Sequence, residues 1–485
     1  MSYKNYIFII FFNYLISGFF FNPENISLLE ASAISYNDFR SSNPASMANH
    51  KGITIKLIGI NFGIQNNFLS ISNYNDINGA NFDDISDPNY YPKSKFYELF
   101  NEGMQFNSHL ALNLPFSDVV YNNISFHSKT YAISQLNLPQ SLVQLALYGN
   151  QPNQNYNLNA KGSIDIISEY SIGYSKKISN TSLGVRLKYL QGLVYGELTN
   201  LYDNSSYFFT DTTIGFLGES KYLINQAVGG SGFAMDLGVI YKKINSNWTF
   251  GLSANNLFGT IYWDSDNLTY NLLKDDIIQN LPLRHNEKHF FSISLDTLNA
   301  MNMMGTPLNE IYSTESFSVI EFNSLDGIPF NTDSLIANNL LIETDYGSYL
   351  LKTDQLSNDT IDLLGFAVPD YKTDYPTYIN MNIQKDFEEQ VSLCFNISTG
   401  FSNSLQNLEK WTFSSGLLFN RFKKIPITLG ISLSEKGRLN SGFSMGYNAG
   451  PFLINYGMSF KDAIFLQSAK GIDLSLSLLF KINNS

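Results

Sequence analysis

The sequence predicts an all-β protein, a transmembrane antiparallel β-barrel of about 14 strands with an N-terminal plug-like segment and long extracellular loops. Three observations predict this fold: few charges among many aromatic residues, apolar and polar residues that alternate with period two, and connections that are alternately long and short. A barrel explains the alternation because each strand faces lipid on one side and the lumen on the other.

The composition is unlike that of a soluble protein. Charged residues make up 15% of the 485 residues, where a soluble domain carries about 25%. The 38 Phe, 30 Tyr and 3 Trp residues together nearly equal the 30 basic and 42 acidic ones. A mean hydropathy of -0.10 is nevertheless too polar for a bundle of transmembrane helices. The net charge of -12 argues against a nucleic-acid partner, which would require a basic surface.

The N-terminus has the form of a secretory signal. Lys4 precedes a short apolar run over residues 6–21, and Ala31 and Ala33 form an A-x-A-like cleavage site. Cleavage nearer Gly18 and a single anchoring helix are the alternatives. We therefore expect export to the bacterial outer membrane.

This interpretation divides the chain into three parts. Residues 1–33 are the expected signal peptide, residues 34–52 a periplasmic or plug segment, and residues 53–485 the barrel. The barrel carries one large insertion over residues 259–377.

Alternation is the strongest signal, because successive side chains of a strand point to opposite faces. Over residues 472–482, Ile, Leu and Phe alternate with Asp, Ser and Lys. Residues 183–189, 233–242, 248–255, 427–434 and 452–459 show the same pattern. Candidate strands begin near residues 53, 107, 119, 170, 183, 233, 248, 378, 391, 411, 427, 442, 452 and 472.

The polar face of these strands consists mostly of Ser, Gly, Asn and Thr. A soluble β-sandwich, the alternative, would expose Lys and Glu on its wet face, so small polar residues favour a barrel lumen. Aromatic residues at strand ends, such as Trp248 and Trp411, fit interfacial girdles. The residues expected to face the lumen are Arg186, Lys188, Asp236, Asn255, Asn455 and Asp473.

Connection lengths set the expected topology, because such barrels have short periplasmic turns and longer outer loops. The long connections are 63–106, 129–169, 191–232 and 259–377. The short turns lie near 114–118, 178–182, 243–247, 386–390, 422–426 and 449–451. Residues 291–295 also alternate, but a fifteenth barrel strand would break the in–out parity, so we assign them to the insertion.

The insertion at residues 259–377 is strongly acidic. It contains 18 acidic and 5 basic residues, so the whole acidic excess of the chain lies within it. Loops of this length without a function are uncommon. The insertion either binds cations or a partner, or keeps a surface cap soluble.

Several tracts of the barrel resemble a known family. They are SNPA (42–45), EYSIGYSK (169–176), LGVRLKYLQG (183–192), GFAMDLGVIY (232–241) and FGLSANNLFG (250–259). On these tracts the chain resembles uncharacterised Gram-negative outer-membrane barrels with a domain of unknown function, related to the FadL-type fatty-acid and hydrocarbon transporters. The tracts cover most of the barrel but not residues 63–106 or 259–377.

The resemblance implies a fourteen-strand barrel with its N-terminal segment folded inside. It makes Asn43, Pro44 and Ala45 candidate plug or gating residues, and implies transport of a small hydrophobic molecule. No fatty-acid-binding residue of the family is mapped onto this chain. The alternative is a non-transporting surface or assembly barrel that anchors residues 259–377 for a protein partner.

The sequence contains no catalytic or cofactor motif, and we expect a non-enzymatic, porin-like protein without cofactor. His285 and His289 have helical spacing but lack a third ligand, and the acidic cluster at Asp83, Asp84 and Asp87 lacks the spacing of a calcium loop. Cys394 lies on a strand as a small apolar residue. The expected partners are outer-membrane lipid, the assembly machinery through the C-terminal strand, and a small hydrophobic molecule.

Overall fold

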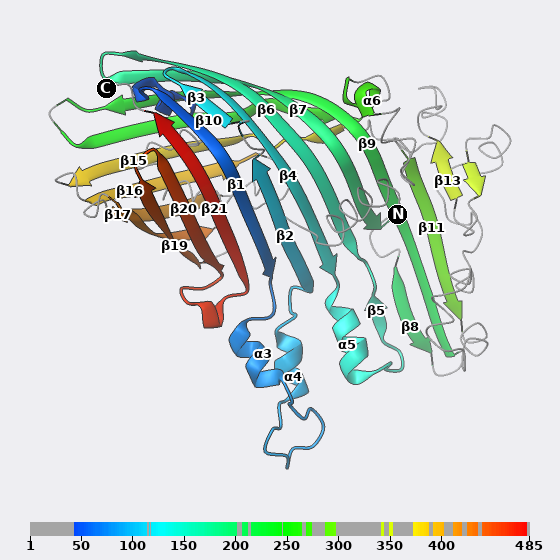
Figure 1. Ribbon diagram of the computed structural model, residues 1–485. Coiled ribbons are helices and arrows are strands. Elements are labelled where there is room, and N and C mark those ends of the chain that lie inside the picture. Colours follow the sequence, from blue (N-terminus) through cyan, green and yellow to red (C-terminus); the bar gives the residue numbers. More distant parts are fainter. Residues whose placement is uncertain are drawn as a thin grey trace, which may run out of the picture.

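The computed structural model is a closed antiparallel β-barrel with most of its helices and short strands at one end (Figure 1). It describes residues 43–113, 116, 118–200, 206–211, 215–244, 246–263, 268–273, 287–296, 341–343, 349–352, 372–387, 391–401, 411–419, 424–434 and 439–482. The signal peptide expected over residues 1–33 lies outside this set.

Fourteen of the described strands form the wall, and each pairs antiparallel with the next in chain order. They are β1 (Ile53–Asn66), β2 (Met104–Asn113), β4 (Ile124–Leu138), β6 (Lys161–Ile178), β7 (Thr181–Asn200), β9 (Gly215–Lys242), β10 (Trp248–Tyr262), β15 (Tyr378–Phe387), β16 (Val391–Gly400), β17 (Trp411–Phe419), β18 (Ile427–Ser434), β19 (Leu439–Ala449), β20 (Phe452–Lys461) and β21 (Gly471–Ile482). The last strand closes the wall on the first, from Ile53 opposite Ile482 to Gln65 opposite Gly471. The predicted barrel of 14 strands is confirmed.

The wall is apolar outside and polar inside. On β18, Leu429, Ile431 and Leu433 are each about half exposed, whereas Thr428 and Ser432 are buried. A soluble protein shows the reverse, because it buries its apolar side chains. The alternation therefore places a lipid-facing band outside and Ser, Thr and Asn inside, as the sequence predicts.

The two ends of the barrel differ. At the short-turn end, tight connections join pairs such as β6–β7, β9–β10 and β19–β20. At the long-connection end, residues 67–103, 139–160 and the insertion leave the wall. This end carries the helices α3 (Ile71–Ile77), α4 (Lys93–Glu98), α5 (Gln140–Tyr148), α6 (Leu268–Leu273) and η7 (Leu466–Ser468). No helix among the described residues is long and apolar enough to cross a membrane.

Seven short strands lie outside the fourteen. They are β3 (Asp118–Tyr121), β5 (Asn155–Asn157), β8 (Tyr207–Asp211), β11 (Glu287–Asp296), β12 (Leu341–Glu343), β13 (Tyr349–Lys352) and β14 (Lys372–Asp374). Strand β11 pairs with residues 217–226 of β9, whereas β10 pairs with β9 only from Ser231 onward. Residues 291–295 thus form a strand that is not one of the fourteen, as expected from parity.

The wall strands on one side are longer than predicted. Strand β6 begins at residue 161 instead of 170, and β9 begins at 215 instead of 233. The expected connections 129–169 and 191–232 are therefore wrong in their bounds, and the true connections are 139–160 and 201–214. One cause is that Ile167 faces inward, into a buried apolar cluster, so apolar and polar residues do not alternate in the first half of β6.

A second difference lies after β2. The strand expected near residue 119 is the short β3, which pairs with β1 and β4. A turn with Asn122 at φ 50° then leads into β4 at Ile124. Asparagine tolerates this left-handed conformation, which explains how so tight a hairpin forms there.

Candidate functional site

A short helix lies inside the barrel at the short-turn end. This is the 3₁₀-helix η2 (Pro44–Asn49), which contacts β6, β7 and β9. With its N-cap Asn43 it forms what we call the plug segment, residues 43–49. Pro44 suits the first helical position because its fixed φ matches the helix and its missing N–H needs no partner there. Asn43, Pro44 and Ala45 are all buried.

Asn43 fastens the plug segment to the wall. Its side-chain amide donates hydrogen bonds to the carbonyl oxygens of Val239 on β9 (3.0 Å) and Leu252 on β10 (3.1 Å). Its Oδ1 accepts from the N–H of Ala45 at 3.0 Å, which caps the helix. One side chain thus joins the helix to two strands of the wall.

Three glycines make room for the plug segment. A Cβ on Gly184 would overlap the backbone of Pro44 and Ala45, and one on Gly238 would overlap the Asn43 side chain. A Cβ on Gly173 would come within 2.9 Å of Met47 Cε. Glycine inside a strand often marks such a close approach, and this is the sequence signal that could have located the plug contact.

Above the plug segment lies a group of buried charges on three strands. Arg186 on β7 faces Asp236 on β9 directly in the register, with 3.3 Å between Nη1 and Oδ2. Lys188 Nζ lies 3.0 Å from the same Oδ2 and 3.3 Å from Glu169 Oε2 on β6. The two cations and two anions balance, as buried charges must. We call these four residues, with Asn256 and Tyr375, the charge cluster.

The charge cluster also holds the end of the acidic insertion. Tyr375 donates to Glu169 Oε2 at 2.8 Å, and Asn256 Nδ2 donates to the carbonyl oxygen of Pro376 at 2.9 Å. Asn256 Oδ1 accepts from Lys188 Nζ at 2.7 Å. The backbone N–H of Asn256 donates to Asp236 at 2.9 Å. The insertion therefore ends on the same side chains that lie above the plug segment.

Strand β10 is irregular where it meets the charge cluster. Its register with β9 shifts twice between Ala254 and Thr260. Asn256 and Phe258 both have positive φ, 56° and 59°. Backbone in this region costs about 1–3 kcal/mol per non-glycine residue. The distortion turns the Asn256 side chain toward the buried charges, where it bonds to Lys188.

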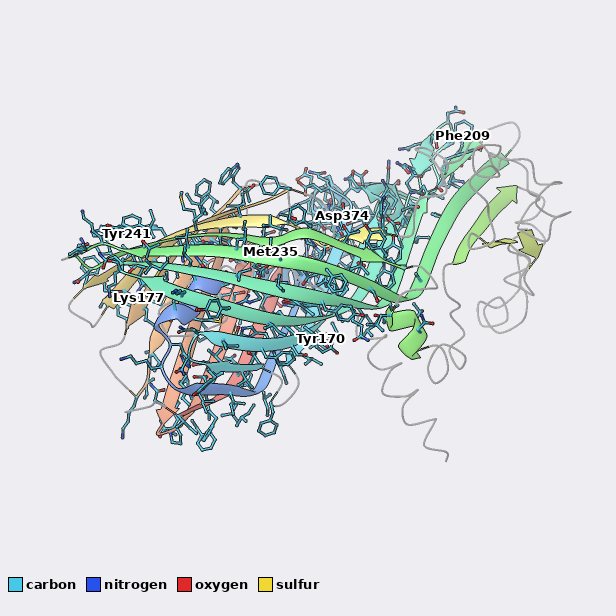
Figure 2. The ribbon with its side chains drawn as sticks, turned by 90° about the horizontal axis from the view of Figure 1, so that it is seen from above. Tyr170, Lys177, Phe209, Met235, Tyr241 and Asp374 are labelled. Carbon is cyan, nitrogen blue, oxygen red and sulfur yellow. The ribbon has the colours of Figure 1, made fainter. Side chains whose placement is uncertain are left out.

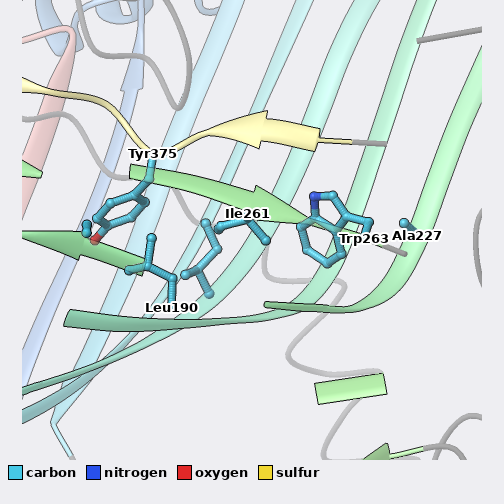
Figure 3. Close-up of a cluster of buried hydrophobic side chains, with 7 residues drawn as sticks. Leu190, Ala227, Ile261, Trp263 and Tyr375 are labelled. Atoms are coloured by element: carbon cyan, nitrogen blue, oxygen red, sulfur yellow. The ribbon is translucent and has the colours of Figure 1, made fainter. Parts of the chain in front are cut away.

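An apolar cluster follows the charges toward the long-connection end (Figure 3). Its buried members are Ile167, Leu190, Ala227, Ala234, Ile261, Trp263 and Tyr375. Trp263 donates from Nε1 to Thr373 Oγ1 at 3.0 Å, which satisfies its one polar atom. Tyr375 belongs to both groups, with its ring in the apolar cluster and its hydroxyl on Glu169.

Arg186 is the polar residue with spare hydrogen-bonding capacity in this arrangement. It is 8% exposed, and its Nε and Nη2 have no hydrogen-bond partner among the described residues. The inward residues of β7 run in order from Gly184 at the plug segment, through Arg186 and Lys188, to Leu190 in the apolar cluster. Unsatisfied buried donors are rare in proteins, so these two groups suit a polar atom of a ligand.

The other expected lumen residues are distributed elsewhere. Asp473 is buried on β21, 2.6 Å from Lys461 Nζ, and accepts from Ser459 Oγ at 2.8 Å. Asn255 is buried and bonds to Ser253 Oγ at 3.1 Å. Asn455 is half-buried and lies 3.5 Å from Ser477 Oγ. The structure thus brings Arg186, Lys188 and Asp236 together, and leaves the other three apart.

Sequence reasoning missed Glu169, Asn256 and Tyr375. Glu169 lay in a segment expected to be a loop, and Tyr375 lay in the insertion. Among the described residues, no group of three or more His, Cys, Asp or Glu side chains is placed to hold a metal ion. The charge cluster consists of ion pairs and hydrogen bonds that join three strands of the wall to the end of the insertion.

Fold and site together define a class: a closed antiparallel barrel of the outer-membrane type, with a helix held inside it. Residues 44–458 match the model of a family of unknown function, DUF5723. The chain belongs to this family. No curated protein matches the chain.

Several solved structures are similar at low identity. The toluene transporter TbuX of Ralstonia pickettii has 11% identity and a TM-score of 0.44, with 96% of this chain and 100% of that one covered. The toluene transporter TodX of P. putida has 10% identity and a TM-score of 0.43, with 92% and 94% covered. The CymD monoaromatic hydrocarbon channel has 10% identity and a TM-score of 0.39, with 94% and 93% covered. The match to DUF5723 confirms the resemblance to a barrel family of unknown function that was stated from the sequence.

Proposed function

We propose that the protein is an outer-membrane barrel that binds and passes a small hydrophobic molecule carrying one polar group. Arg186 carries this proposal, because it is buried between the plug segment and the apolar cluster, and two of its guanidinium nitrogens have no hydrogen-bond partner among the described residues. The polar group of the ligand binds Arg186, and its apolar body lies against Leu190 and Trp263. The plug segment closes the path below.

The plug segment suits a gate because hydrogen bonds of one side chain help to fasten it to the wall. The Asn43 amide donates to one carbonyl oxygen on each of two strands. A net contribution of about 1 kcal/mol per hydrogen bond makes such a fastening reversible. The expected signal peptide at residues 1–33 delivers the barrel to the outer membrane, and the expected plug region at residues 34–52 contains the plug segment.

Two measurements test this function. Asn43→Ala should raise the ion conductance of the barrel in planar bilayers, because it removes both bonds to the wall. Asn440→Ala is the matched control, since its buried amide also makes two hydrogen bonds but lies at the long-connection end of β19. Mass spectrometry of apolar molecules extracted from the purified protein should detect a ligand in wild type and much less in Arg186→Gln. An unchanged conductance together with no extracted ligand would contradict transport.

The expected orientation places the long-connection end outside the cell. An epitope inserted beside Ile85, which is 78% exposed, should be reached by antibody on intact cells. An epitope beside Ser246 in the β9–β10 turn should be reached only after permeabilisation. The reverse pattern would place the short turns outside.

One observation favours the second function, a barrel that anchors the insertion for a protein partner. Strand β9 has 28 residues, and its first part pairs with β11 of the insertion instead of β10. The wall thus continues into a sheet that carries part of the insertion. This function predicts that deleting residues 274–340 abolishes capture of the partner and leaves the conductance of Asn43→Ala unchanged.

A further inference from the structure

The sequence repeats one tripeptide at three of the short turns. Lys-Lys-Ile occurs at 176–178, 242–244 and 423–425, and these are the three Lys-Lys pairs of the chain. The tripeptides border the β6–β7, β9–β10 and β17–β18 connections, all at the short-turn end. A chain with a net charge of -12 thus concentrates paired lysines at one end of its barrel.

The side chains of the repeats are exposed. Both lysines of the first two repeats and Lys424 of the third lie on the surface. The isoleucines are exposed too: Ile178 by 55%, Ile244 by 65% and Ile425 by 40%. Exposed isoleucines that recur at the same end of the barrel suit a partly apolar environment.

The first two repeats lie side by side. The N–H of Lys242 donates to the carbonyl oxygen of Asn180 at 2.9 Å, and Thr181 is the register partner of Tyr241. Figure 2 shows Lys177 and Tyr241 together at one end of the barrel. The two turns therefore form one surface, which we call the lysine rim: residues 174–178 and 241–244, together with Lys424 and Ile425.

Part of the lysine rim follows the outer face of the wall, toward lipid. On β6 the inward residues Gly173 and Ser175 alternate with Tyr174 and Lys176, so Lys176 follows the outer face. Lys243 follows Tyr241 in the same way, directly after the end of β9. Tyr174 and Tyr241 are about half exposed, as are the aromatic girdles at the headgroup level of a bilayer.

A neighbouring lysine, Lys385, also lies beside aromatic rings at this end of the barrel. Lys385 Nζ lies 5.0 Å from the centroid of the Trp248 ring and 4.8 Å from that of Phe387. Trp248 begins β10, directly after the second repeat. A long apolar stem along an aromatic ring with its ammonium toward water is the arrangement of a side chain at a membrane interface.

We propose that the lysine rim binds the headgroups of anionic phospholipids in the leaflet at the short-turn end. The lysines neutralise the phosphates, while the isoleucines and tyrosines lie among the first carbons of the acyl chains. A soluble polyanion would need the lysines alone, and would not explain apolar residues beside them on the outer face. This inference rests on the barrel's lying in a membrane, but not on transport.

The three tryptophans of the chain allow a test at each end. Trp248 lies beside the lysine rim, Trp411 is 53% exposed at the long-connection end, and Trp263 is buried. Replacing two of the three with Phe leaves Trp248 or Trp411 as the single fluorophore. The full-length proteins are reconstituted in mixed bilayers of phosphatidylcholine and phosphatidylglycerol. In one series phosphatidylglycerol is brominated and in the other phosphatidylcholine is, and the brominated lipid quenches tryptophan on contact.

At Trp248, phosphatidylglycerol should bind about fivefold more tightly than phosphatidylcholine, the effect of one lysine near an anionic surface. The variant Lys176→Gln/Lys177→Gln/Lys242→Gln/Lys243→Gln should abolish this preference, and the corresponding four Lys→Arg changes should preserve it. In wild type, 0.5 M NaCl should weaken it through screening. At Trp411 the two lipids should quench in proportion to their abundance.

Matched variants and a folding check make each outcome decisive. The control removes four lysines at the other end, and leaves the preference at Trp248 unchanged: Lys93→Gln, Lys95→Gln, Lys161→Gln and Lys372→Gln. Heat-modifiable migration confirms that each variant is folded. Equal quenching by the two lipids at wild-type Trp248, or the same preference at both ends, would overturn the proposal. The conductance of Asn43→Ala in the same bilayers reports separately on transport.

Discussion

The two sides of the barrel are built differently. On the side formed by β6, β7, β9 and β10, strands have 15 to 28 residues, and they carry the plug contacts, the charge cluster and the distorted backbone of β10. On the side formed by β15 to β20, strands have 8 to 11 residues with Ser, Thr and Asn inside. The second side follows the general barrel pattern closely. The difference teaches that the plug contacts, the charge cluster and the distorted backbone lie together on one wall.

The largest expected effect is on the charge cluster. Asp236→Leu leaves Arg186 and Lys188 buried without their shared anion, which should lower the free energy of unfolding by about 3–5 kcal/mol. On the other wall, Ser432→Ala removes one hydrogen bond from Asn440 and should cost about 1 kcal/mol. Urea titrations in detergent would measure both. An equal decrease in the free energy of unfolding for the two variants would contradict the distinction between the walls.

The second test concerns the lipid face of the plainer wall. Leu429 is 48% exposed on the outer face, so Leu429→Arg should destabilise the barrel by roughly 2–4 kcal/mol if the residue lies near the bilayer midplane. Gly430 is on the inner face, where Gly430→Ser should be far milder. Unfolding in bilayers compares the two. A costlier serine would show that the faces of β18 are reversed.

The third test separates stability from gating. Gly184→Ala places a methyl group against the plug backbone, and such overpacking costs about 1–3 kcal/mol when the neighbour cannot move. If the plug segment is released instead, unfolding should change little and conductance should rise. Gly442→Ala on the other wall, whose Cβ would lie 3.0 Å from Ser459 Cβ, is the control. It should leave conductance as in wild type.

The smallest expected effect is that of pH on the plug segment. Burial, with Lys481 as the lesser cause, lowers the pKa of His50 below its usual value of 6.5. When the plug segment is displaced into solvent, His50 has its usual pKa and is protonated at a higher pH than in the docked segment. The docked form therefore loses stability relative to the displaced form as pH falls below 6.5. Conductance should therefore rise modestly between pH 7 and pH 5. A His50→Gln variant should lack this rise, and an identical pH response in it would exclude His50 as the cause.

How much could be predicted also differs between the walls. The starts of β15, β16, β17, β18 and β20 agree with the predicted residues, because alternation there is unbroken. On the other wall, the inward-facing Ile167 hid the alternation of the first half of β6, and Glu169 with it. An apolar side chain on the inner face removes the period-two hydropathy signal even where the strand pairs regularly.

Partners in the site could not be found from local pattern. Glu169 and Tyr375 are 206 positions apart, and Asn256 and Pro376 are 120 apart. The two residues of each pair come into contact only after the strands between them have paired in register. Alternation predicted that Arg186, Lys188 and Asp236 share a face, but not that they share a hydrogen-bond network. The glycines opposite the plug segment were visible in the sequence, yet their meaning depends on what fills the space.

The pairing of β1 with β21 bears on how the barrel forms. Ile53 lies opposite Ile482, so β1 and β21 each keep one unpaired edge until the rest of the barrel has been synthesised and they can pair. Such non-local contacts are slow to form and leave exposed edges that invite aggregation until they do. The same proximity of the two strands means that they could be joined by a short linker. A circularly permuted chain opened beside Ile85 would then contain β21 and β1 as consecutive strands, and should close its wall sooner.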